Sequence, residues 1–186
     1  MLVVILVIQC KKDEPEPEPE PPKEFKIVDG NFLNALIERG VDTNNDHIID
    51  STEAEAVYYL NIDSCGISII TGIQNFINLK ELRCQDNNIS SLDVSYNTAL
   101  EVLYCNNNQL TKLIVSGDTS LLYLYCFHNQ LATLDVSKNT NLSVLDLNYM
   151  PSLFKVCVRT IPFPPGGFIL YTTGSPNVFF TTDCNK

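Results

Sequence analysis

Oxygen-bearing side chains recur at short intervals between residues 42 and 53. This segment reads DTNNDHIIDSTE, with carboxylate or amide side chains at its first, third, fifth, ninth and twelfth positions. A ring of such oxygens is what a hard cation such as Ca²⁺ requires. The spacing therefore indicates a cation-binding loop or, alternatively, a polar loop that caps a neighbouring domain.

The same segment resembles the loop of the EF-hand family, in register over its twelve positions. His47 departs from the family pattern because it replaces the glycine of the sharp turn, where a side chain carries a penalty for left-handed backbone. Since only one such loop is present, the resemblance implies a structural calcium ion that rigidifies the start of the next domain. It also implies the ligands, which are the side chains of Asp42, Asn44 and Asp46, the carbonyl of Ile48, Asp50 directly or through water, and both oxygens of Glu53.

Seven cysteines raise the question of metal or redox chemistry. Cys84, Cys105 and Cys126 are 21 residues apart, and no CxxC pair or histidine cluster provides the spacing of a zinc site. Because a free cysteine behaves as a small buried hydrophobic residue, we expect these three thiols to pack in a ladder. Cys157 and Cys184 lie outside this series, and a disulfide between them and two free thiols are both open.

Repeats of 21 residues must position these groups. The template LxxLxCxxNxLxxL fits three times, and a degenerate turn at residues 60–70 fits one residue out of phase. We expect each turn to contribute a short strand, while asparagines and Val-Ser segments turn the corners. Because no turn can bury its apolar face alone, the turns must stack. The leading leucines of the template are Leu79, Leu100, Leu121 and Leu142, followed in step by Leu82, Leu103, Leu124 and Leu145.

The template resembles the leucine-rich repeat of internalin-like and Bacteroidetes surface proteins, in which turns end in a phrase such as LDVSxN. Residues 92–97 and 134–139 keep this phrase, whereas residues 113–118 depart from it, so a local difference is expected at that corner. The resemblance covers about residues 28–184. It implies an α/β solenoid, right-handed, with short parallel strands on one face, an N-terminal helical cap with the calcium-type loop and a β-rich C-terminal cap.

The first 25 residues differ in composition from the rest. Residues 2–8 are apolar and are followed by Cys10, which resembles a bacterial lipoprotein signal and implies lipidation of Cys10 and export to the outer membrane or cell surface. The alternative is an irregular start of a cytosolic protein.

The whole chain is expected to divide into five segments. We expect a signal and anchor at 1–10, a Pro/Glu-rich linker at 11–25, a cap with the EF-hand-type loop at 26–59, repeats at 60–153 and a C-terminal cap at 154–186.

Side chains between the core leucines should point outward from the sheet. Several are aromatic, and contiguous exposed aromatics mark interaction surfaces, although mutual stacking along the ladder is the alternative. We expect a ligand-binding face formed by Tyr104, Tyr123, Tyr125, Phe127, His128 and Tyr149.

These features predict a non-catalytic surface binding or adhesion module. A net charge of −10 argues against nucleic acid and anionic lipid as partners, so membrane contact is expected only through a lipid anchor. Enzymatic activity is not expected, because His128 should face outward and Cys126 inward, which separates the one histidine–cysteine neighbourhood. A protein is the expected partner, while a glycan-binding surface and a purely structural spacer are the alternatives.

Overall fold

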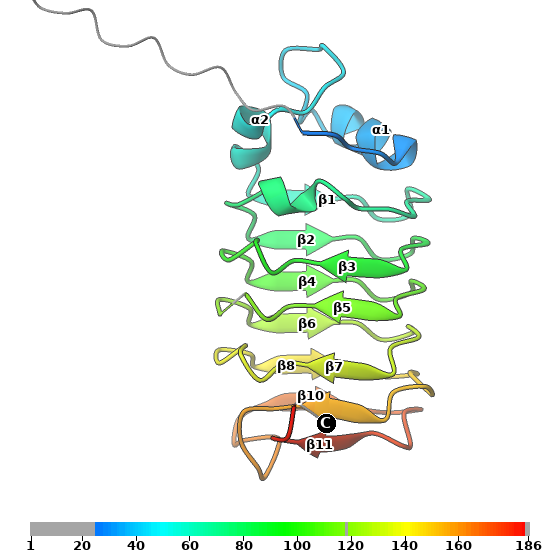
Figure 1. The fold of residues 1–186 in the computed structure, drawn as a ribbon, viewed down its shortest axis with the longest axis vertical. Coiled ribbons are helices and arrows are strands. Elements are labelled where there is room, and N and C mark those ends of the chain that lie inside the picture. The colour runs from blue at the N-terminus through cyan, green and yellow to red at the C-terminus, as the bar shows by residue number, and fades with distance from the viewer. Residues whose placement is uncertain (1–24, 118, 185–186) are drawn as a thin grey trace, which may run out of the picture.

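The computed structural model describes residues 25–117 and 119–184. Short helices lie at one end, and strands stack beneath them along the long axis to the C-terminal end (Figure 1). No helix in these residues combines the length and apolar character needed to cross a membrane. The stack confirms the prediction of a solenoid of parallel strands.

The largest sheet has six parallel strands, one from each turn, in the order β1-β2-β4-β6-β8-β10. Each strand has three residues, and its central leucine points into the core while its neighbours point outward, as the two-residue period of a strand requires. The strands are β1 Tyr59–Asn61, β2 Glu81–Arg83, β4 Val102–Tyr104, β6 Tyr123–Tyr125, β8 Val144–Asp146 and β10 Ile169–Tyr171.

Two smaller parallel sheets face the large one across the core (Figure 1). The sequence predicts strands on one face only, but Leu92 between outward-pointing Ser91 and Asp93 has the alternation of a strand as well. The opposite side is divided into two sheets, because β5 and β7 are not paired. At the corners that follow β3 and β5, the Gly117 backbone lies so close to Ser95 that a Cβ would collide with its carbonyl. The strands are β3 Ser91–Asp93 with β5 Lys112–Ile114, and β7 Thr133–Asp135, β9 Lys155–Cys157 and β11 Phe179–Thr181.

Asparagine side chains join consecutive turns at the corners after β2, β4 and β6. Asn108 Nδ2 lies 2.9 Å from the Cys84 carbonyl oxygen of the preceding turn and 3.2 Å from that of Cys105, and its Oδ1 accepts from Ile89 N–H at 3.0 Å. Asn87 in the turn before and Asn129 in the turn after make the same kinds of contact, and all three asparagines are buried. These amides satisfy main-chain groups that would otherwise be buried without partners.

The residue before the ladder position has a left-handed backbone in every turn, including the turns in which Cys65, Met150 or Ser175 takes the place of the asparagine. This conformation closes the tight corner, and it is costly for residues other than glycine, least so for asparagine, aspartate and histidine. The corresponding φ angles lie between 52° and 74° in all six turns, at Ser64, Asp86, Asn107, His128, Tyr149 and Gly174.

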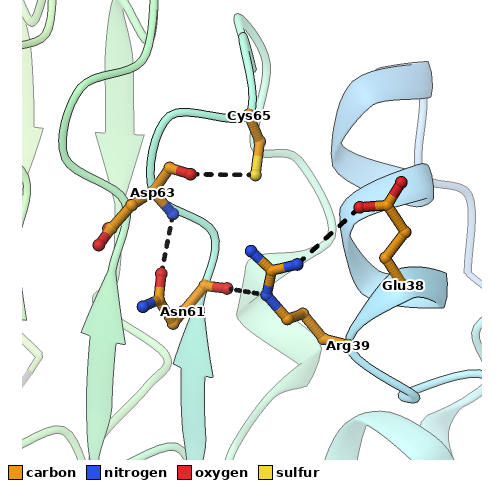
Figure 2. Close-up of polar contacts among 5 residues, drawn as sticks. All are labelled: Glu38, Arg39, Asn61, Asp63 and Cys65. Carbon is orange, nitrogen blue, oxygen red and sulfur yellow. Dashed lines mark hydrogen bonds and ion pairs between the residues drawn. The ribbon is translucent and has the colours of Figure 1, made fainter.

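The N-terminal end is covered by α1 (Gly30–Glu38) and α2 (Ser51–Glu55), with a 3-10 turn η1 (Ile73–Asn75) in the first repeat. Asp29 caps α1 through one carboxylate oxygen and accepts from Ser68 and Ile69 N–H through the other, both at 2.9 Å. After α1, Arg39 donates from Nε to the Asn61 carbonyl of β1 at 2.8 Å (Figure 2). The two ends of α1 are therefore bonded to the first turn.

Replacing Asn108 by alanine should lower the free energy of unfolding by about 2–4 kcal/mol, because several buried main-chain groups lose their partner. Urea denaturation followed by circular dichroism measures the change. Asn88→Ala is the matched control, since Asn88 is exposed and its Oδ1 accepts a single bond from Gln109. Equal losses in the two variants would contradict the ladder as a source of stability.

Candidate functional site

Two aromatic pairs form on the outward side of the large sheet and its corner. Tyr104 and Tyr125, in register on β4 and β6, stack with ring centroids 4.7 Å apart and an interplanar angle of 3°. At the corner, His128 and Tyr149 stack at 4.6 Å and 8°, and Phe127 meets His128 edge-on at 5.7 Å. Ring stacking at this spacing follows from the distance between neighbouring strands.

Mutual stacking does not remove these groups from solvent. Tyr123 is 38% exposed and Tyr149 is 51% exposed, His128 is exposed, and Tyr104, Tyr125 and Phe127 are half-buried. We call these six residues the aromatic face. The structure thus brings together all six residues that the sequence predicts there, and both the exposed surface and the stacking are present.

Two further residues extend this surface, and the search for periodic leucines did not include them. Tyr171 of β10 lies in the same outward column as Tyr125, with Asp146 of β8 between them. Tyr171 was missed because the chain takes 25 residues from Leu145 to its partner Leu170, and this longer turn breaks the period of 21. At the other end of the column, the Arg83 guanidinium lies over the Tyr104 ring, 4.9 Å from its centroid.

Cys84, Cys105 and Cys126 form a ladder of fully buried thiols in the core. Burial raises the pKa of all three thiols above its ordinary value, so the thiolate needed for nucleophilic attack is disfavoured. His128 lies on the outside of the corner while Cys126 lies inside. The arrangement provides no nucleophile–base pair between them.

At the C-terminal end, Cys157 and Cys184 are joined by a disulfide with Cα atoms 5.5 Å apart. It ties β9 to the residues after β11. A carboxylate oxygen of Asp135 on β7 lies within 4.8 Å of both sulfurs. As a disulfide, these cysteines have no thiolate to offer a metal ion.

The calcium-type loop lies between α1 and α2, and its carboxylates are directed at main-chain donors. Asp42 accepts from the N–H groups of Asp46 and His47 at 3.2 and 3.0 Å, and Asp46 accepts from Ile48 at 2.8 Å. His47 has a φ of 64°, so the left-handed backbone expected at the sixth loop position is present. Asn44 also accepts from the Asp46 N–H, at 2.9 Å.

The Glu53 carboxylate is hydrogen-bonded to the first residues of the loop. Its Oε1 accepts from the backbone and hydroxyl of Thr43 at 2.7 and 2.9 Å, and its Oε2 accepts from Asp50 N–H. Asp50 in turn accepts from Glu53 N–H, which completes a capping box at the start of α2. Burial raises the pKa of Glu53, but these hydrogen bonds outweigh it and hold the pKa below the ordinary 4.5.

The donor chemistry of the loop fits a hard cation, but the oxygens do not converge in this arrangement. Among residues 25–117 and 119–184, one group of three acidic, cysteine or histidine side chains has its ligand atoms within 4.8 Å of one another. It consists of Asp135, Cys157 and Cys184, and none of these belongs to the loop. Both oxygens of Glu53, the expected bidentate ligand, accept hydrogen bonds within the loop. The calcium role of the loop therefore stays a prediction, as does lipidation of Cys10, which lies outside the described residues together with the linker up to residue 24.

Comparison with known proteins identifies the repeats. Residues 77–116 match a protein-family model described as leucine-rich repeats in two copies. None of the curated protein sequences matches the chain.

Three solved structures from Listeria monocytogenes align with the chain. The functional domain of InlJ, described as including a cysteine ladder, aligns with a TM-score of 0.52 and 24% identity over 74% of this chain and 39% of its own. Internalin inlF aligns with a TM-score of 0.36 and 18% identity, over 70% of this chain and 56% of its own. Internalin C2 aligns with a TM-score of 0.32 and 19% identity, over 82% and 93%. The likeness to the InlJ domain is one of fold, and this chain spans less than half of that domain.

Glu53→Gln should destabilise the protein by about 1 kcal/mol at pH 7, because the cap loses its charged acceptor. A carboxyl with a lowered folded-state pKa stabilises the fold above its unfolded pKa of about 4.5, and this contribution is lost as the pH falls through the lower folded value. The difference between wild type and variant in urea unfolding should therefore shrink below pH 4.5. Glu55→Gln, at an exposed residue of the same helix, should show no such trend.

Proposed function

We propose that this leucine-rich-repeat protein is a non-catalytic binding module that recognises another protein through its aromatic face. The aromatic face carries the proposal, because exposed aromatic side chains supply much of the binding energy at protein interfaces. Tyr123 on β6 and Tyr149 at the corner after β8 present large ring surfaces, and tyrosine loses little conformational entropy on binding because it has two side-chain torsions.

The absence of a catalytic role is part of the proposal. The three core thiols are buried and hard to ionise, and His128 stacks on Tyr149 away from Cys126. A surface of stacked rings on short strands favours recognition over bond-making chemistry. A lipid anchor at Cys10 and a Pro/Glu spacer would hold such a module away from the cell surface, which is the location that we propose.

A glycan is the second candidate partner. Tyr104 and Tyr125 stack almost parallel, with Asn107 nearby at the corner, and flat rings next to amides also suit sugars. Selective binding on a glycan array that depends on these tyrosines would favour this alternative over a protein partner.

Changing Tyr104, Tyr123 and Tyr125 to serine should abolish selective capture of a protein from host or bacterial surface extracts by the immobilised full chain. The serine replacements remove the ring surface and leave the core leucines unchanged. A variant with serine at Tyr58 and Tyr96, which are 49% and 68% exposed away from the aromatic face, is the matched control and should capture as wild type does. Circular dichroism verifies folding. Equal capture by both variants would contradict the proposal and leave the sheet as a spacer.

We propose separately that the loop from Asp42 to Glu53 binds calcium weakly, because binding competes with the hydrogen bonds of Glu53. Millimolar calcium should raise the thermal unfolding midpoint of the full chain, and Asp42→Asn should remove the rise. Magnesium is the control cation, since its smaller, octahedral shell suits such a loop poorly. An unchanged midpoint with calcium would leave the loop as a polar cap.

A further inference from the structure

A carboxylate lies between two tyrosines at the C-terminal end of the large sheet. Tyr125, Asp146 and Tyr171 are direct partners in the registers β6–β8 and β8–β10, so their side chains stand in one outward column at the spacing of neighbouring strands. Tyr171 is 46% exposed, and Tyr125 and Asp146 are half-buried. The column therefore forms a surface site with an anionic centre and aromatic walls.

Asp146 forms no ion pair with a lysine, arginine or histidine side chain among the described residues. The ion pairs there involve Glu38, Glu81 and Glu101, whereas Asp146 Oδ1 accepts from the Asn148 N–H at 3.0 Å. Burial raises the pKa of Asp146 above its ordinary 3.8, although the nearby His128 and the Asn148 hydrogen bond lower it. A partly desolvated carboxylate of this kind gains more from an incoming cation than an exposed one does.

The same sheet already contains a guanidinium that contacts a tyrosine ring and a carboxylate. Arg83 lies over the Tyr104 ring and bonds through Nε to a carboxylate oxygen of Glu81 at 2.5 Å. A tyrosine ring and a carboxylate thus bind one arginine within the molecule itself. At Tyr125, Asp146 and Tyr171 the ring and the carboxylate are repeated, and no lysine, arginine or histidine among the described residues forms an ion pair with this carboxylate.

The large-sheet side as a whole carries more carboxylates than cationic groups, although three of the four carboxylates lie near Arg83, three or four turns from Asp146. The outward strand positions and the corners that follow them hold four carboxylates, on Asp63, Glu81, Asp86 and Asp146, against the single guanidinium of Arg83. This excess lies on the same side as the aromatic face and raises the local concentration of cationic groups.

We propose that Tyr125, Asp146 and Tyr171 form a receptor for an arginine side chain of the partner protein. Arginine fits better than lysine because its planar guanidinium stacks on rings and bonds a carboxylate through two N–H groups. The inference rests on the proposed function, since it names the chemistry by which the aromatic face selects its partner.

Titration of the full chain with N-acetyl-arginine amide, followed by NMR, tests the site. The amide signals of these three residues should shift, and N-acetyl-citrulline amide, the neutral isostere, should leave them in place. Asp146→Asn should weaken arginine binding by about tenfold, as expected for loss of a charge-assisted pair. Asp93→Asn, which removes the same charge from the exposed opposite side, should change it less than about twofold. The lysine analogue should bind more weakly than arginine.

Tyr171→Ala should also weaken binding and Tyr171→Phe should restore it, whereas Tyr96→Ala should have no effect. Asp146→Asn is expected to fold, because it removes a carboxylate whose charge is disfavoured by burial. Equal shifts with arginine and citrulline, or equal loss in Asp93→Asn and Asp146→Asn, would overturn the receptor. If the receptor fails in this way while the serine variant of the aromatic face still loses capture, the surface binds proteins without an arginine and only the further inference is wrong.

Discussion

The buried amides of Asn87, Asn108 and Asn129 hold the architecture together. A tight left-handed corner after each strand leaves N–H and carbonyl groups pointing into an apolar core, where an unpaired polar group is costly. Each amide bonds to main-chain groups of its own turn and of the turn before it, so the same side chain stabilises the corner and joins the two turns. The regular spacing of the outward tyrosines follows, because strands held in register by this ladder repeat their side chains at a fixed interval.

The two ends of the stack require different solutions, since each lacks one neighbour. At the N-terminal end, Asp29 caps α1 and the first repeat at once, and Arg39 bonds the carbonyl of Asn61 on the edge strand. Near the C-terminal end, Met150 occupies the ladder position, and the hydroxyl of Ser175 takes over by accepting from its N–H and donating to Leu147. The disulfide then fixes the last strands. Main-chain satisfaction is thus maintained along the whole stack by changing residue types at its ends.

The repeated part of the fold can be predicted from sequence because Leu82, Cys84 and Asn87 are buried, and the same residue types recur at the equivalent buried positions of the next turns. The strands opposite the large sheet were harder to predict, since Leu92 serves equally in a corner or a strand. Tyr171 escaped detection because a longer turn precedes it. At the calcium-type loop, the ambiguity is chemical, because Asp50 and Glu53 have the spacing of both a ligand pair and a helix capping box. The structure shows the capping box, and the ligand role stays a prediction.

The ladder also has a consequence for how such a protein changes over evolutionary time. Asn108 and Asn129 make matching bonds to their own and preceding turns, so one interior repeat can substitute for another in the stack. In-frame duplication or unequal recombination within the coding sequence can therefore add or delete a complete repeat without breaking the bonding pattern. Gene rearrangement can then lengthen or shorten the outward sheet readily, whereas the specialised ends tolerate no such exchange.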